Sequence, residues 1–388
     1  MARLTIYDRR ERALVAVADA LLAPAALRRT FRRHNPEPPR RILCFRLERI
    51  GDLLMTAHAL AELRALAPDA SIDLAVGSWN QEIAAAIPGV DRIETLDAGW
   101  LARDGLGYTP LGLARRAGGW RSRHYDLAIN FEPDIRTNLA IAATGARRRV
   151  GFANGGGSAL LDVALDYDVS VHTVENARRL VYAAVGRAPD IAVEWALRIP
   201  EASRAKATRL LAPFGGGLKV GMHVSGGRAI KQWPEGRFRD VAEHLVTNRS
   251  ATIVLTGSPA DHAQVELVRA ALPPNRVLDL SADVSLLTAA AVIEQLDLFV
   301  TGDTGPMHLA NAVGTPIVAV FGPSDPRRYA PRGVRDTVVR IDLPCSPCNR
   351  IRRPPERCVG HTPDCLAGIE TAQVLAAIDE TLRLGAAR

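Results

Sequence analysis

The residues best suited to chemistry lie in one short segment, Gly302 to His308, which has the sequence Gly-Asp-Thr-Gly-Pro-Met-His. An apolar run from Leu298 to Thr301 precedes this segment and predicts a strand that leads into it. Glycine allows close approach of the backbone, and Pro306 suits the first turn of a helix whose amides attract an anion. Asp303 and Thr304 therefore have two interpretations: they belong to a phosphate site, or they cap that helix.

An α/β fold must position this segment. From Arg40 onward, short apolar strands alternate with helical patterns, which is typical of parallel βαβ units. A second series of the same kind follows the glycine-rich segment 213–217, where the sequence predicts a hinge. We therefore expect two Rossmann-like doubly wound domains that face each other across a cleft, with ligands beyond the carboxyl ends of the strands. The predicted divisions are an amphipathic basic extension (1–39), an amino-terminal domain (40–212), a carboxy-terminal domain (213–370) and a final helix (371–388).

Composition and charge exclude some classes of partner. The chain has 388 residues, of which 23% are charged, and its formal net charge is +7. An aromatic fraction of 5% argues against nucleic acid as a partner, because such platforms stack bases on exposed aromatic side chains. The arginines fall in several clusters, which suit an acidic membrane surface or a phosphorylated glycolipid, and equally an ordinary solvated surface.

The amino terminus contains the best candidate for membrane contact. No apolar run reaches the roughly 18 residues that a spanning helix needs. The stretch from Ala13 to Ala23 is short, contains Asp19, and follows Arg9, Arg10 and Arg12, so it predicts an amphipathic helix. Two roles stay open for this helix: contact with a membrane surface, or packing against the domain. Because the stretch is not a convincing export signal, we expect a cytoplasmic protein, peripheral at the inner membrane face if the first role holds.

Several motifs together resemble one enzyme family. The segment from Gly302 to Ala310, followed by Gly314-Thr315-Pro316 and Phe321-Gly322-Pro323, resembles the signature of glycosyltransferase family 9, which contains the ADP-heptose:lipopolysaccharide heptosyltransferases. Further matches lie upstream, in Arg49-Ile50-Gly51-Asp52 with Thr56 and in Ser225-Gly226-Gly227 with Lys231 and Trp233-Pro234. Their order and separation resemble the family from about residue 40 to 370. The resemblance implies the GT-B architecture for the two domains.

The resemblance also implies a reaction. It is the inverting transfer of a heptose, or a related sugar, from a nucleotide diphosphate donor such as ADP-heptose to a lipopolysaccharide-type glycan or glycolipid, with no cofactor in catalysis. An alcohol is a poor nucleophile, so a carboxylate should take its proton in the transition state. Asp52 matches the family's residue for this role, and its alternative role is the N-cap of a helix that begins at Leu53. The amino-terminal domain would bind the acceptor, and the final helix would cross back to it.

The carboxy-terminal domain would bind the donor. Lys231 and the helix amides near Thr304-Gly305 would offset the charge of the leaving diphosphate. Asp261 matches the position where the family holds the ribose, although the family usually has the longer Glu there. The family often has hydroxyl side chains where this chain has Gly226-Gly227, so we expect backbone amides to contact phosphate instead. The predicted donor-binding residues are Ser225, Gly226, Gly227, Lys231, Asp261, Asp303, Thr304, Gly305 and His308.

The chain has five cysteines. Cys44 lies in the first predicted strand and is most simply a buried apolar residue. The other four lie in a segment rich in proline and arginine, 345–365, and they are Cys345, Cys348, Cys358 and Cys365. This spacing is typical of a tetrathiolate site for zinc or iron, and four reduced thiols are the alternative. Some bacterial protein heptosyltransferases, which this segment resembles, bind iron through such a loop. A metal here would be structural and would take no part in transfer.

The same residues are compatible with several other functions. A protein O-heptosyltransferase, or a GT-B enzyme that uses another nucleotide sugar, would have the same fold and a different substrate. A nucleotide-sugar isomerase would need a second acid or base near the anomeric carbon, and His308 is the candidate that the sequence offers. A non-catalytic nucleotide-sugar-binding module would keep the donor site alone.

Overall fold

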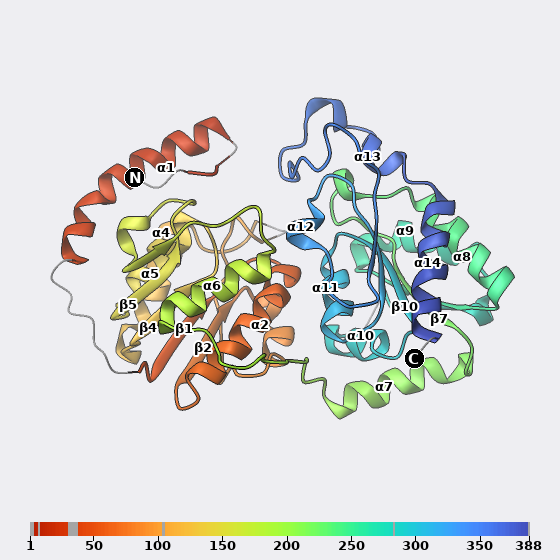
Figure 1. Ribbon diagram of the computed structural model, residues 1–388, viewed down its shortest axis with the longest axis horizontal. Coiled ribbons are helices and arrows are strands. Elements are labelled where there is room, and N and C mark those ends of the chain that lie inside the picture. Colours follow the sequence, from red (N-terminus) through yellow and green to blue (C-terminus); the bar gives the residue numbers. More distant parts are fainter. Residues whose placement is uncertain (1–3, 7, 30–37, 103–104, 282–283, 387–388) are drawn as a thin grey trace. The chain divides into compact units, whose positions relative to one another are not determined.

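The structure is a computed structural model, and it describes residues 4–6, 8–29, 38–102, 105–281 and 284–386. The chain divides into two compact units, Met1–Ala196 and Leu197–Arg388. Each unit contains one six-stranded parallel sheet with helices packed on it (Figure 1). These two sheets confirm the predicted fold class of two Rossmann-like doubly wound domains.

The sheet of the first unit consists of β1 (Arg41–Phe45), β2 (Ser71–Val76), β3 (Arg92–Thr95), β4 (Leu127–Asn130), β5 (Arg148–Phe152) and β6 (Val163–Leu165). The strands lie in the order β3-β2-β1-β4-β5-β6. The chain order reverses between β1 and β4, which is the switch point at which doubly wound sheets bind ligands. Strand β1 is apolar and buried beyond its first residue, because helices cover both faces of the sheet. Cys44 is buried there, as predicted.

The helices of the first unit are α1 (Arg9–Leu22), α2 (Ile50–Leu66), α3 (Gln81–Ala85), α4 (Pro110–Gly118), α5 (Ile135–Ala143) and α6 (Thr173–Val185). Helix α2 packs against α6, and α4 packs against α5 (Figure 1). Under α4 and α5, Leu43 and Phe45 of β1 join Trp120 and Ile141 in one hydrophobic cluster. This packing holds β1 and β4 side by side, and the first turns of α2 and α5 follow their carboxyl ends.

The sheet of the second unit consists of β7 (Lys219–His223), β8 (Thr252–Thr256), β9 (Val277–Asp279), β10 (Leu298–Gly302), β11 (Ile317–Val320) and β12 (Thr337–Val339). The order is β12-β11-β10-β7-β8-β9, which repeats the arrangement of the first unit. The switch point of this sheet therefore lies between β7 and β10. Every residue of β8 and β10 is buried, as expected for strands covered on both faces.

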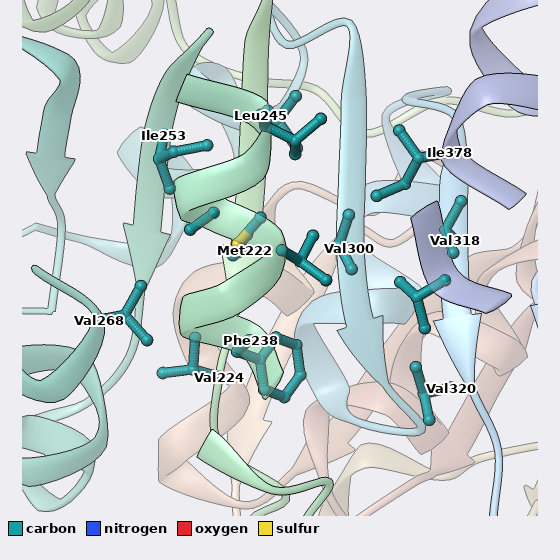
Figure 2. Packing of buried hydrophobic residues seen from close by; sticks show 14 of the residues in the cluster. Met222, Val224, Phe238, Leu245, Ile253, Val268, Val300, Val318, Val320 and Ile378 are labelled. Atoms are coloured by element: carbon teal, nitrogen blue, oxygen red, sulfur yellow. The ribbon is translucent and has the colours of Figure 1, made fainter. Parts of the chain in front are cut away.

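The helices of the second unit are α7 (Glu201–Leu211), α8 (Glu235–Arg249), α9 (His262–Arg269), α10 (Leu286–Ile293), α11 (Gly305–Ala312), α12 (Pro326–Tyr329), α13 (Asp364–Ala367) and α14 (Thr371–Ala386). Figure 2 shows the core that joins some of them to the sheet. Phe238 and Leu245 of α8 and Ile378 of α14 belong to the same cluster as Val300 of β10. In the described part of the chain, no helix combines the length and the apolarity needed to cross a bilayer.

One domain boundary and the packing of one helix differ from the sequence-based expectation. The second unit begins before α7, not at the glycine-rich segment 213–217. Helix α7 packs against α10, and Nε of Arg204 lies 2.9 Å from a carboxylate oxygen of Glu294. The sequence predicts that the final helix crosses back to the first half, whereas α14 packs against α8, β11 and β12. Val374 and Ile378 place α14 in the core of the second unit.

Candidate functional site

Most of the predicted donor residues lie at the carboxyl edge of the second sheet, at its switch point. The segment Ser225–Gly227 follows β7, and the segment Asp303–Gly305 follows β10. The two strands are neighbours in the parallel sheet, with Thr301 paired to His223. Because parallel neighbouring strands end at the same edge, the loops that follow them lie close together.

An ion pair joins these two loops. The Nζ atom of Lys231 lies 2.8 Å from Oδ2 of Asp303, and the two side chains are 18% and 12% exposed. Burial alone would raise the pKa of Asp303, but Lys231, a hydrogen bond from Ser324 and the charge of nearby His308 hold this pKa below its usual range. Asp303 is therefore a carboxylate that fixes the position of the Lys231 ammonium.

The first turn of α11 presents backbone amides at the same edge. Helix α11 begins at Gly305, and its N-cap residue Thr304 makes no side-chain hydrogen bond to that turn. The hydroxyl of Thr304 instead lies 3.0 Å from the hydroxyl of Thr301. Thr304 therefore occupies the N-cap position without bonding the first turn through its side chain, and the amides of this turn can bind an anion.

The loop after β7 is closed by the side chain of Gln232. Its Oε1 accepts a hydrogen bond from the amide of Gly226 at 2.5 Å, and its Nε2 donates to the carbonyl of Val224 at 2.8 Å. The amide of Gly227 donates to Oγ of Ser225 at 3.1 Å. A Cβ atom at Gly226 would lie 2.6 Å from the backbone nitrogen of Gln232, so glycine is needed for this close approach. The amides of Gly226 and Gly227 are thus bonded within the loop, and their contact with phosphate stays a prediction.

Asp261 links the loops after β7 and β8. Its carboxylate accepts hydrogen bonds from the amide and the hydroxyl of Ser258, at 2.8 and 2.6 Å. Burial would raise the pKa of Asp261, but hydrogen bonds from Ser225 and Ser258 and the charge of His223 lower it. The carboxylate thus caps the short 3-10 turn before α9, and its contact with a ribose stays a prediction.

The predicted base of the first unit, Asp52, lies in the first turn of α2, directly after β1. Helix α2 begins at Ile50, earlier than the predicted Leu53, and Arg49 is its N-cap residue. Oδ2 of Asp52 accepts a hydrogen bond from the amide of Arg49 at 3.3 Å, and Oδ1 lies 3.5 Å from Nη2 of Arg46. The side chain is 30% exposed. Asp52 therefore stabilises the start of the helix and still presents a carboxylate to solvent.

Arg46 holds Asp52 from the buried side. Only 4% of the Arg46 side chain is exposed, and its Nη1 lies 3.0 Å from Glu48 and donates to the carbonyl of Phe131 at 2.7 Å. Its Nε donates to the carbonyl of Asp52 at 3.2 Å. A buried guanidinium needs such partners, since an unpaired charge would be costly there. Arg46 thereby ties the loop after β1 to the end of β4.

Glu132, which follows β4, is a second carboxyl group at this switch point. It is 2% exposed and accepts hydrogen bonds from the amides of Leu47 and Glu48. Burial and the negative charge of Glu48 raise the pKa of Glu132 to about 8, against the opposing charge of Arg46. The edge of the first sheet therefore combines an exposed carboxylate with a buried carboxyl group that is protonated near neutral pH.

Residues 116–358, more than half of the chain, match the family described as glycosyltransferase family 9 (heptosyltransferase). The chain belongs to glycosyltransferase family 9. It is similar to lipopolysaccharide heptosyltransferase 2 of Salmonella typhimurium, with 26% identity over 311 residues that cover 75% of this chain and 85% of that protein. The structure of E. coli ADP-heptose lps heptosyltransferase II has the same fold, with a TM-score of 0.72 and 21% identity over 89% of this chain and 99% of that one. The structure of a family 9 glycosyl transferase from Veillonella parvula is also similar. Its TM-score is 0.75, with 22% identity over 90% of this chain and 99% of that one.

Family membership makes the chain a glycosyltransferase, as predicted, and its candidate residues fall into two groups. Asp52, Lys231 and Asp303 were predicted from motifs. Asp303 directly follows β10, whereas Asp52 and Lys231 lie further along the segments that follow β1 and β7. The motifs missed four residues, which are Arg46, Glu132, Gln232 and Ser324. The sequence contained a signal for two of these, because Glu132 and Ser324 follow the ends of β4 and β11.

In this family 9 enzyme the cysteine segment follows β12 and ends in α13, which contains Cys365. The four cysteines are free thiols; burial, with the other three close by, raises the pKa of Cys365 to about 11. Within the described residues, no group of three or more His, Cys, Asp or Glu side chains is arranged so that it could hold a metal ion. The backbone amide of Asn349 donates a hydrogen bond to the carbonyl of Pro323 at 2.8 Å. The side-chain Oδ1 of Asn349 accepts one from the backbone amide of Asp325 at 2.9 Å. The segment therefore braces the loop that carries Ser324.

Proposed function

We propose that this enzyme is an inverting heptosyltransferase with a nucleotide diphosphate donor, ADP-heptose, and a lipopolysaccharide-type glycan acceptor. Its family and its similarity to a lipopolysaccharide heptosyltransferase support this substrate class. The observation that carries the proposal is the Lys231–Asp303 ion pair beside the first turn of α11. An ammonium and helix amides at one sheet edge can bind the diphosphate and stabilise the charge that develops as it leaves.

The proposed reaction is a single displacement. The acceptor hydroxyl attacks the anomeric carbon of the donor from the face opposite the diphosphate. A bond forms between the acceptor oxygen and this carbon, while the bond from the carbon to the diphosphate oxygen breaks and its electron pair leaves with the nucleoside diphosphate. Asp52 accepts the hydroxyl proton, because its exposed carboxylate is held by Arg46 and the start of α2. In this scheme the first unit binds the acceptor and the second binds the donor.

We also propose that the cysteine segment binds one structural zinc or iron ion. Thiolates suit both ions in tetrahedral sites, and the predicted ligands are Cys345, Cys348, Cys358 and Cys365. The other three thiols contribute to the raised pKa of Cys365, which supports their proximity to this residue. Since the described side chains are not arranged as a metal site, the segment would close around the ion when it binds. The ion would brace the donor-side loop and take no part in transfer.

Product analysis tests the proposed reaction. The full chain is incubated with ADP-heptose and a core lipopolysaccharide acceptor, and the anomeric configuration of the product is determined by NMR. We expect transfer with inversion, and a retained configuration would rule out the single displacement. Transfer to a protein but not to the glycan would identify a protein O-heptosyltransferase. Rearrangement of the donor without an acceptor would indicate an isomerase, and tight donor binding without any transfer would indicate a binding module.

A further inference from the structure

Helix α1 exposes an apolar face. Leu14, Val17 and Leu21 are 73%, 61% and 77% exposed. Their spacing of three and four residues places them on one side of the helix. Surface helices ordinarily present polar residues to solvent, yet between residues 13 and 21 every exposed position of α1 is apolar. The other exposed residues of this stretch are Ala13, Ala16 and Ala20.

Contacts on the opposite side of α1 fix this orientation. Val15 is buried over Gly156, where an added Cβ atom would collide with a methyl carbon of Val15. One turn further along, the carboxylate of Asp19 accepts a hydrogen bond from the amide of Gly157 at 2.5 Å. Both glycines have positive φ values, +90° and +74°, in the left-handed region that side chains rarely adopt. Val15 and Asp19 thus hold α1 on this glycine loop, and Leu14, Val17 and Leu21 remain exposed.

Positive charge accompanies the apolar face. Arg9, Arg10 and Arg12 are exposed in the first turn of α1. Arg10 precedes Leu14 by four residues and therefore lies on the same side of the helix. Residues 1–40 contain nine arginines and four carboxylates, which gives this part of the chain +5 of the total charge of +7. An apolar stripe with arginines at its end matches a membrane surface, which offers acyl chains beneath anionic phosphates.

We propose that this face of α1 binds the surface of a membrane that contains anionic phospholipids. Leu14, Val17 and Leu21 enter the boundary between headgroups and acyl chains, and the arginines of the first turn bind lipid phosphates. A second copy of this chain fits the face less well. Three large apolar side chains on a helix of 14 residues fall well short of the about 800 Å² per partner that stable protein interfaces bury. Membrane binding through α1 is independent of the transfer reaction.

Cosedimentation of the full chain with lipid vesicles tests this proposal. We expect binding to phosphatidylcholine vesicles with about one third phosphatidylglycerol, and at least about tenfold weaker binding without the anionic lipid. Replacement of Leu14, Val17 and Leu21 together by glutamine should weaken binding to the anionic vesicles by about tenfold or more, because the apolar anchors are lost. Replacement of the three first-turn arginines by glutamine should remove the difference between the two lipid compositions.

A matched control replaces three exposed apolar residues of the second unit, Leu267, Val334 and Val359, by glutamine. This variant should bind like the wild type, and circular dichroism and melting temperature should be the same for all variants because the positions are exposed. Equal binding by the wild type and the α1 glutamine variant would overturn the proposal. Wild-type self-association that this variant abolishes, without vesicle binding, would also overturn it and would assign the face to a second copy.

Discussion

The two units place their candidate residues at the same point of the same fold, but the charges there differ. At the switch point of the first sheet, three carboxyl groups gather around one guanidinium, that of Arg46. At the switch point of the second sheet, Asp303 is matched by Lys231, and the first turn of α11 adds backbone amides. The first region has more negative than positive groups and suits the removal of a proton. The second suits the binding of an anion.

This difference shows where function resides in such folds. The two sheets have the same strand order, so the sheets alone do not distinguish an acidic region from an anion-binding one. The distinction comes from the few residues that follow each central strand, such as Glu132 after β4 and Asp303 after β10. Function therefore depends on these loops, and substitutions in each region test the difference between the two.

The largest effect is expected from removal of the proposed base in the first region. Asp52→Asn keeps the shape of the side chain but cannot accept the proton, so kcat should fall about 100- to 10,000-fold with little change in donor affinity. Initial rates and calorimetric titration with the donor measure these two quantities. Asp342→Asn is the matched control, because this carboxylate is 97% exposed and pairs with Arg340 at the surface. A kcat close to that of the wild type in Asp52→Asn would remove the catalytic distinction between the two regions.

The next largest effect is expected in the second region. Lys231→Met removes the ammonium, and kcat/KM should fall about 100-fold because the leaving diphosphate loses its positive partner. Asp303→Asn leaves the Lys231 ammonium but removes the carboxylate that fixes its position. We therefore expect a smaller loss of activity, about tenfold, mainly in kcat. The double variant should lose less than the product of the two single effects, since the residues act as a pair. Strictly multiplicative effects would mean that the ion pair is not used in the reaction.

A smaller effect, on stability, is expected from Glu132. Its pKa is about 8 in the fold and 4.5 for an ordinary glutamate, so between these values the folded state keeps a proton that the unfolded state has released. The free energy of unfolding should therefore fall as pH rises through this range, by at most about 1.4 kcal/mol per pH unit. Glu132→Gln stays neutral and can accept the same amide hydrogen bonds, so this contribution to the slope should disappear. Urea denaturation across the range measures both proteins, and equal slopes would contradict the shifted pKa.

The smallest effect on transfer is expected from the cysteine segment. Elemental analysis should find about one zinc or iron ion per chain, and Cys348→Ser should lose it and melt at a lower temperature. Since Asn349 ties this segment to the loop of Ser324, donor KM should rise about two- to fivefold, with kcat nearly unchanged. Cys44→Ala, in the core of the other unit, should keep the metal. Protein that carries no metal after growth with both ions would support four reduced thiols.

The sequence predicted those parts of both regions that depend on local spacing. Asp52 and Asp303 lie beyond β1 and β10 as expected, because a strand followed by a turn of small residues is recognisable over a few positions. The bonding around Arg46 was out of reach, since it donates to a carbonyl 85 positions away that only the pairing of β1 with β4 brings near. The hydrogen bond from the amide of Gly226 to Gln232 was also out of reach, because it depends on the conformation of the loop rather than on its composition.

Each unit has its own sheet and its own hydrophobic core. Because β10, α8 and α14 pack in one hydrophobic cluster, the core beneath Asp303 is built from residues of the second unit. If the first unit binds the acceptor and the second the donor, as proposed, a lineage of such enzymes can diverge in acceptor while its donor machinery is inherited intact. For protein engineering, the same separation makes the chain before Leu197 and the chain after it natural units for exchange between related transferases.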